Sequence, residues 1–122
     1  MAASVSDATS NAACDMAEAL GAKAILVPTF SGRTASRVAR LRPRRPIIAL
    51  THHPGVARNL AIEWGVTPVV IPEGRDVEDL FSRSVEAARQ TAIVDSGDLV
   101  VLTGGTAVNM PGTTNLIRVE TV

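Results

Sequence analysis

AILVPTFSGRT, residues 24–34, is the stretch that decides the fold. Its first four residues, Ala24–Val27, form a short and wholly apolar run, which is typical of a central strand in a parallel sheet. The residues that follow open a helix, which we expect over Gly32–Leu41 and which must end before Pro43. A buried strand that leads directly into a helix is the repeating unit of α/β proteins, so this stretch predicts an α/β fold.

The alternation of strands and helices continues in both directions along the chain. We expect helices over residues 7–20, from 51 or 53 to 65 and from 76 to 88, and strands over 47–50, 66–71, 98–103 and 115–122. Residues 104–114 are too few for a usual crossover, so the last strand should run antiparallel at an edge. Right-handed crossovers then predict the strand order 3-2-1-4-5. The expected architecture is an open three-layer αβα sandwich on a five-stranded sheet, as one domain over residues 1–122.

Composition excludes several classes of function. Hydrophobic residues make up 46% of the chain but aromatic residues only 2%, so the core must consist of Ala, Val, Leu and Ile. A formal net charge of zero argues against nucleic-acid and acidic-membrane partners. No apolar run approaches the roughly 20 residues of a membrane span, and the N-terminus shows no secretion signal. The single cysteine, Cys14, fits a reducing cytoplasm and is expected in the core rather than as a reactive thiol.

The turn after the first strand is the strongest candidate site. A helix start exposes unpaired backbone N–H groups and the positive end of the helix dipole, which suits a phosphate group. Hydroxyls donate to phosphate oxygens, an arginine can bind two of them, and a glycine allows close approach of the backbone. We therefore expect an effector-phosphate site at Thr29, Phe30, Ser31, Gly32, Arg33 and Thr34. The alternative is an ordinary helix start with Ser31 as N-cap.

The predicted topology places a second loop beside this turn. In the order 3-2-1-4-5 the switch point lies between strands 1 and 4, and ligands of open α/β sheets bind outside the carboxyl ends there. The loops that leave these strands are Thr29–Thr34 and Thr103–Thr114, both rich in Gly and Thr. The second loop is either a lid over the same phosphate or a mobile hairpin loop.

Other candidate residues have simpler explanations. Six arginines fall within thirteen residues, and most are expected on a solvated helix face, although some could pair with another subunit or attract an anion: Arg33, Arg37, Arg40, Arg42, Arg44 and Arg45. His52-His53 has no supporting ligand cluster and is expected as loop and capping residues, so no metal site is predicted. Trp64, at a helix end, is expected to anchor the core with its N–H near the surface. No catalytic signature is recognisable, and with Lys23 as the only lysine a P-loop is excluded.

The order of these segments resembles the C-terminal domain of pyruvate kinase. The resemblance rests on GAKAILVPTFSGRTASRVARLRPRRPIIALT (21–51), LAIEWGVTPVVI (60–71), GDLVVLTGG (97–105) and GTTNLIRV (112–119). It implies a regulatory domain that binds an allosteric sugar phosphate or nucleotide and takes no part in catalysis. The barrel that binds magnesium, potassium, phosphoenolpyruvate and ADP would lie in other domains, and none of its motifs occurs here. The chain itself would need no cofactor.

Residue by residue, the resemblance implies that Thr29–Thr34 is the effector-phosphate loop and that Gly112, Thr113 and Thr114 belong to the loop that closes over the effector. Phe30 replaces a lysine of some fructose-1,6-bisphosphate-activated members. The segment Glu73–Asp79 is short and lacks the tryptophan and arginine that some such members use for a second phosphate. A monophosphate effector, such as a sugar monophosphate or AMP, is thus at least as well supported as the bisphosphate.

The resemblance also implies subunit contacts between such domains. An exposed edge strand at Asn115–Val122 predicts a homodimer through pairing across a two-fold axis. Two other functions stay open. The chain could be a ligand-free interaction module of the same fold, or a small enzyme that acts on a phosphorylated substrate.

Overall fold

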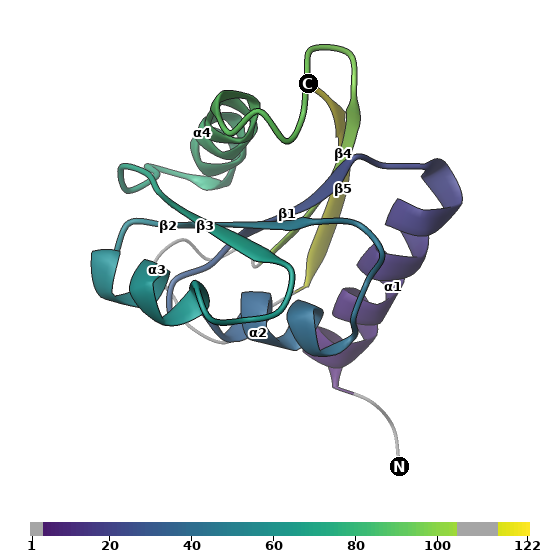
Figure 1. Cartoon of the computed structure of the whole chain (residues 1–122), viewed down its shortest axis with the longest axis horizontal. Helices are drawn as coiled ribbons and strands as arrows, with labels where there is room; N and C mark the ends of the chain where they lie inside the picture. The colour runs from purple at the N-terminus through teal and green to yellow at the C-terminus, as the bar shows by residue number, and fades with distance from the viewer. Residues whose placement is uncertain (1–3, 105–114) are drawn as a thin grey trace.

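The computed structural model describes residues 4–104 and 115–122 and has the predicted alternation of helices and strands. In chain order the elements are α1 (Val5–Leu20), β1 (Ala24–Pro28), α2 (Arg33–Arg40), β2 (Ile47–Thr51), α3 (Pro54–Leu60), β3 (Val66–Val70), α4 (Val77–Gln90), β4 (Leu99–Gly104) and β5 (Leu116–Thr121). The sheet order is β3-β2-β1-β4-β5, parallel except for the β4–β5 pair. Both the order and the antiparallel last strand confirm the prediction (Figure 1).

Helices cover both faces of the sheet. α4 lies on one face, and α1, α2 and α3 lie on the other (Figure 1). Side chains of β1 alternate between two cores: Ile25 and Val27 pack toward α1 and α2, while Ala24 and Leu26 pack toward α4. All four are fully buried, which explains why the strand reads as an unbroken apolar run. Phe81 is the one large aromatic residue within these cores among the described residues.

Side chains and glycines define most helix ends. Ser4 caps α1 by accepting a hydrogen bond from Asp7 N at 3.0 Å, and Gly21 ends that helix with φ +64°. Asp76 caps α4 by accepting from Asp79 N at 2.8 Å. The third helix is shorter than predicted, because α3 ends at Leu60 and turns occupy residues 61–65.

Trp64 does not anchor the core, and that prediction is wrong. Its position after the end of α3 leaves it 46% exposed, with the Arg42 guanidinium 4.9 Å from the ring centroid. The ring therefore packs beneath a cation at the surface rather than among the strands.

The two edges of the sheet differ. β3 pairs with β2 through its odd-numbered residues, since Gly65 O accepts from Ile47 N and Ile71 N donates to Thr51 O. The backbone nitrogen of Pro68 therefore points away from β2. Its missing N–H removes no hydrogen bond between the two strands, and it leaves the free edge of the sheet with one donor fewer. β5 has no proline, so its outer edge keeps its donors and acceptors.

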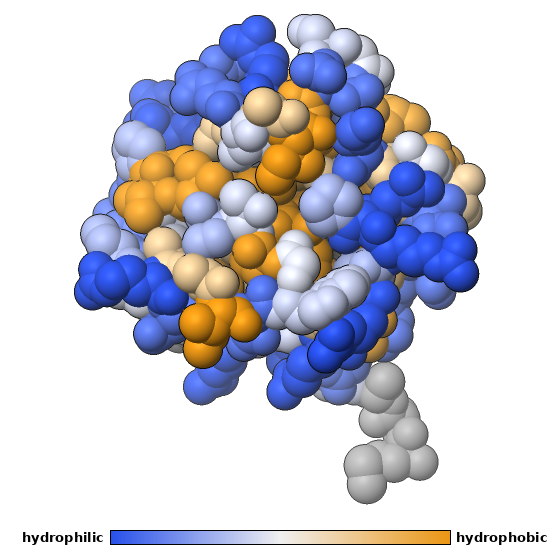
Figure 2. Space-filling model, in the orientation of Figure 1, coloured by the Kyte–Doolittle hydropathy of each residue, from blue (hydrophilic) through white to orange (hydrophobic). Residues whose placement is uncertain are grey.

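Apolar side chains also reach the surface. Figure 2 shows apolar patches bordered by hydrophilic residues on the face that Figure 1 presents. Within the part of the chain that the structure describes, the large hydrophobic residues exposed by 38% or more are Val5, Leu20, Leu41, Ile62, Trp64, Val70 and Val119. Within residues 4–104 and 115–122, no helix has the length and apolar character that crossing a membrane requires.

Candidate functional site

The predicted phosphate turn lies at the carboxyl end of β1, a strand that pairs with β2 on one side and β4 on the other. Thr29 continues the β1–β2 ladder, since its N–H donates to Leu50 O at 2.8 Å. The Thr29 Oγ1 atom accepts a hydrogen bond from Gly32 N at 2.9 Å. Thr29 therefore fixes the turn that brings the chain from β1 into α2, next to the switch point of the sheet.

The start of α2 has no side-chain cap. Its N-cap residue is Gly32, with φ +92°, and no side chain accepts a hydrogen bond in the capping position. Ser31 Oγ accepts a hydrogen bond from Arg33 N at 3.4 Å, while the N-cap position itself belongs to Gly32 rather than to Ser31. The first turn of α2 also has no acidic residue to balance the helix dipole. This helix start therefore retains the features that attract an anion.

The turn faces two different spaces. Thr29 and Phe30 line a cavity of about 30 Å³ together with His52, one residue each of β2 and α4, and the segment that follows β3. Ser31, Gly32 and Arg33 instead line a groove of about 300 Å³ between α2 and α3. The predicted site residues thus lie together in sequence but point to opposite sides of the turn.

Exposure separates the predicted ligand groups. Ser31 and Arg33 are exposed, and no partner of the Arg33 guanidinium occurs among the described residues. Thr34 is only 7% exposed, so its hydroxyl lies inside the fold rather than at the surface. Gly112, Thr113 and Thr114 lie outside the described residues. Of the predicted residues Thr29–Thr34, Ser31 and Arg33 are therefore the exposed ones, while Gly32 and Thr34 are buried.

Phe30 forms an aromatic cluster with the two histidines, which the sequence did not predict. Its ring lies edge-on to His52 at 5.7 Å and to His53 at 5.0 Å between centroids. The two imidazoles are 4.1 Å apart, and His52 Nε2 lies 3.9 Å from Glu73 Oε2. His53 occupies the N-cap position of α3 without a side-chain bond, so the expectation of loop and capping positions is met. The predicted strand order could have indicated this cluster, because the turns after β1 and β2 leave adjacent parallel strands at the same edge of the sheet.

The segment before α4 carries one arginine, Arg75. Arg75 is 81% exposed, and its Nη2 lies 3.4 Å from Asp79 Oδ1. Asp79 Oδ2 also accepts from Arg75 N and from Arg83 Nε, both at 2.9 Å. These hydrogen bonds hold the pKa of Asp79 far below its usual value, and the bond from the Arg75 backbone N–H has the largest effect. Arg75 is therefore engaged with a carboxylate of α4.

Metal and thiol chemistry find little support in the described chain. No group of three or more His, Cys, Asp or Glu side chains within residues 4–104 and 115–122 is arranged to hold a metal ion. Cys14 packs against the core cluster of α1 and α2, and burial, with a smaller effect of Asp15, raises the pKa of its thiol to about 11. A thiol with so high a pKa is a poor nucleophile.

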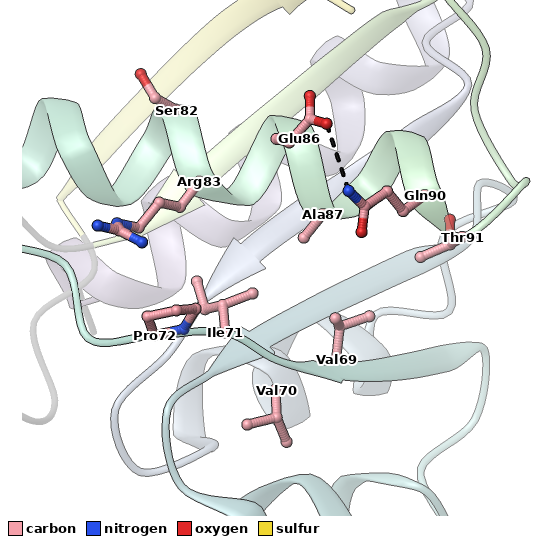
Figure 3. Close-up of a pocket in the computed structure, with 10 residues that line it drawn as sticks. All are labelled: Val69, Val70, Ile71, Pro72, Ser82, Arg83, Glu86, Ala87, Gln90 and Thr91. Carbon is pink, nitrogen blue, oxygen red and sulfur yellow. Dashed lines mark hydrogen bonds between the residues drawn. The ribbon is translucent and has the colours of Figure 1, made fainter.

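Another groove lies away from the turn, between β3 and α4. It has a volume of about 510 Å³, and Val69 and Ala87 contribute to its apolar lining (Figure 3). Its charged residues are already paired: Arg83 with Asp79, and Glu86 with Arg89 and Gln90. The groove is thus unlike a phosphate site.

Comparison with known proteins identifies the family to which the chain belongs. The family model described as "Pyruvate kinase, alpha/beta domain" matches residues 7–120. The chain is 41% identical over 117 residues to a pyruvate kinase of Clostridium acetobutylicum, which covers 96% of this chain and 25% of the relative. It is 39% identical over 119 residues to pyruvate kinase 2 of Synechocystis, covering 98% of this chain and 20% of the relative. The chain thus spans a fifth to a quarter of the length of these relatives.

Proposed function

Because the chain belongs to the family of the pyruvate kinase alpha/beta domain, its C-terminal domain, we propose that it is a regulatory domain that binds a phosphorylated effector at the turn Thr29–Thr34. The observation that carries the proposal is the uncapped start of α2. Gly32 offers no side chain to the first N–H groups of the helix, and no acidic residue offsets the dipole. A phosphate group would satisfy both.

The polar groups around this helix start support the same ligand class. Ser31 can donate its hydroxyl to a phosphate oxygen, and Arg33 adds a charged donor that has no competing partner among the described residues. Binding would shift a parent enzyme between conformations in proportion to the difference in effector affinity between them. The catalytic domains of such a parent are the partners of this domain, and its Mg²⁺ and K⁺ ions would bind there. We place the protein in the cytoplasm.

A monophosphate fits the turn better than a bisphosphate. Phe30 supplies no cation at its position, and its ring is packed against two imidazoles. Arg75, the arginine of the segment before α4, is held by Asp79. Within the turn itself Arg33 is the one cationic side chain, which suits one phosphate group. Sugar monophosphates and AMP are the effector classes that follow.

A thermal-shift screen tests the proposal. The panel comprises fructose 1,6-bisphosphate, glucose 6-phosphate, ribose 5-phosphate, AMP, ATP and inorganic phosphate, each at constant ionic strength. We expect a concentration-dependent rise in Tm with a monophosphate ester. In Arg33→Ala the affinity for the phosphate ester should fall about tenfold. This is the lower end of the effect expected for a hydrogen bond to a charged group, because the Arg33 side chain is exposed. Arg44→Ala is the matched control, since Arg44 is 86% exposed and lies outside the turn. No rise with any compound would refute effector binding.

We also propose that β5 forms a subunit interface. β5 is the last strand of the sheet, and Val119 is 38% exposed. Val122 N donates to Asp98 O, so the even-numbered residues of β5 face β4 and Val119 points its backbone groups outward. A twin strand across a two-fold axis could use these groups.

Val119→Pro tests the interface with little effect on the fold, because it removes an outward N–H and no bond to β4. We expect sedimentation analysis to show a dimer for the unmodified chain and a monomer for the variant, with Tm measured at the same concentration to show that the sheet persists. A monomer at high micromolar concentration for the unmodified chain would refute the interface.

A further inference from the structure

Most of the ring-bearing side chains of this chain gather at one place. The sequence contains two Phe, one Trp, two His and no Tyr, so only five side chains carry an aromatic or imidazole ring. Three of the five contact one another, with centroids between 4.1 and 5.7 Å apart: Phe30, His52 and His53. Phe81 serves the core, and Trp64 lies at the surface after the end of α3. We call the three residues in contact the ring cluster.

The ring cluster lies at the carboxyl edge of the sheet and is not part of the core. Phe30 follows β1, and the two histidines follow β2, which pairs with β1 in parallel. All three residues are partly exposed, and the His52 side chain keeps 22% of its surface accessible. Phe81, by contrast, is only 2% exposed. A partly exposed group of rings offers flat apolar surface to a planar ligand group.

We propose that the ring cluster stacks the base of a nucleoside monophosphate whose phosphate group binds at the start of α2. This inference rests on the proposed effector site and names the ligand class that the site selects. Phe30 and Gly32 are two residues apart, so at most about 7 Å of backbone separates the ring cluster from the start of α2. A nucleotide carries a ribose between its phosphate and its base, which lets it reach from one side of the turn to the other. Ribose 5-phosphate has no base and would leave the rings uncovered.

The base would stack on the solvent side of the ring cluster. The cavity that Phe30 and His52 line has a volume of about 30 Å³, which is too small for a base. His53 adds a polar edge, because its side chain makes no capping hydrogen bond at the start of α3. A neutral imidazole has one donor and one acceptor, and both can pair with the edge of a base. The ring cluster therefore offers a flat surface and a hydrogen-bonding group side by side.

The alternative is that the ring cluster only packs two turns together. Backbone groups already fix both turns without the rings. Thr29 N donates to Leu50 O at 2.8 Å, and His53 N donates to Thr51 Oγ1 at 3.1 Å. The sheet and helices pack elsewhere through aliphatic side chains, apart from Phe81. Rings at this edge are thus not needed to hold the turns, which favours a ligand as the reason for them.

AMP and ribose 5-phosphate are the matched probes, because they share the ribose and the phosphate and differ in the base. Calorimetric titration of the 122-residue chain at constant ionic strength gives both dissociation constants. We expect AMP to bind at least about tenfold more tightly, as stacking of one base on an aromatic side chain allows. Phe30→Leu keeps an apolar side chain and removes the ring, so it should bring the ratio of the two constants close to one. Trp64→Leu is the matched control, and it should leave the ratio unchanged because Trp64 lies at the opposite end of α3 from His53.

Proton NMR of AMP gives a second readout that a merely structural role of the rings would not move. Stacking on the ring cluster should shift the ring protons of the bound adenine upfield. His53→Ala should reduce this shift, and it removes no residue of the core. The Tm of each variant without ligand shows that the fold persists.

Three results would overturn the proposal. Equal affinity for AMP and ribose 5-phosphate, with both weakened in Arg33→Ala, would exclude base stacking and leave the effector turn in place. A preference for AMP that survives both Phe30→Leu and His53→Ala would place the base away from the ring cluster. Binding of neither compound would refute the effector site and the nucleotide site together.

Discussion

Replacement of Gly32 by alanine tests the structure of the turn on which the effector site depends. Gly32 has φ +92°, a conformation that costs an L-residue about 1–2 kcal/mol. An added Cβ would also lie 3.3 Å from Val56 Cγ1 and 3.5 Å from Leu60 Cδ2. The contact with Val56 requires a shift of a few tenths of an ångström. We expect Gly32→Ala to lower the free energy of unfolding by about 1–2 kcal/mol, which lowers Tm by roughly 3–10 °C.

Substitutions of two further glycines separate the effect of backbone strain from the effect of the contact with Val56. Gly21 has φ +64° and nothing within 4 Å of an added Cβ, so Gly21→Ala measures the backbone strain alone. Gly55 lies in α3 without a positive φ, and its added Cβ would meet only the end of Arg58 at 3.6 Å. Gly55→Ala should therefore be neutral or stabilise the chain by up to about 1 kcal/mol. Addition of Val56→Ala to Gly32→Ala should relieve the contact but not the strain.

Urea unfolding of these variants gives the free energies directly. Phosphate affinity measured on the same samples should fall in Gly32→Ala and stay unchanged in Gly21→Ala. The reasoning fails if Gly32→Ala is as stable as the unmodified chain, because the turn would then not need the left-handed conformation.

Three further predictions concern the rest of the fold. Asp79→Asn should destabilise the start of α4. Because the folded-state pKa of Asp79 lies below its unfolded value near 4, the carboxylate stabilises the fold above about pH 4, and this stabilisation is lost as the pH falls further. The urea unfolding curves of the two proteins should therefore converge in acid. Cys14, with a thiol pKa of about 11, should react with a disulfide reagent at pH 8 much more slowly in the native chain than in urea, and equal rates would contradict its burial. Leu102→Ala removes a fully buried side chain of β4 and should cost about 2–5 kcal/mol in urea unfolding, whereas a loss below 1 kcal/mol would contradict the packing beneath α4.

The sheet could be predicted because its three central strands, β1, β2 and β4, are buried on both faces. Runs such as Ala24–Val27 contain no polar residue, and the lengths of the intervening segments allow few topologies. The antiparallel last strand followed from one short connection. The location of the turn at the switch point followed from the strand order, so the site and the fold were predicted by the same argument.

The details that failed depend on contacts between distant segments. Trp64 reads as a core residue by its chemistry, but α3 ends before it and leaves it beneath Arg42. Phe30 meets His52 and His53 because two turns leave adjacent strands, which local patterns do not encode. The division of the turn between two spaces arises from the packing of α3 against α2, where Gly32 approaches Val56.

The most direct test of effector binding is a backbone amide NMR titration of the 122-residue chain with glucose 6-phosphate and with AMP. The account predicts saturable shifts concentrated on the amides of Gly32, Arg33 and Ala35, at the start of α2, for one of these compounds. It also predicts that Arg33→Ala weakens the same shifts about tenfold. Absence of shifts at the start of α2 at millimolar ligand, or shifts confined to the groove between β3 and α4, would contradict it.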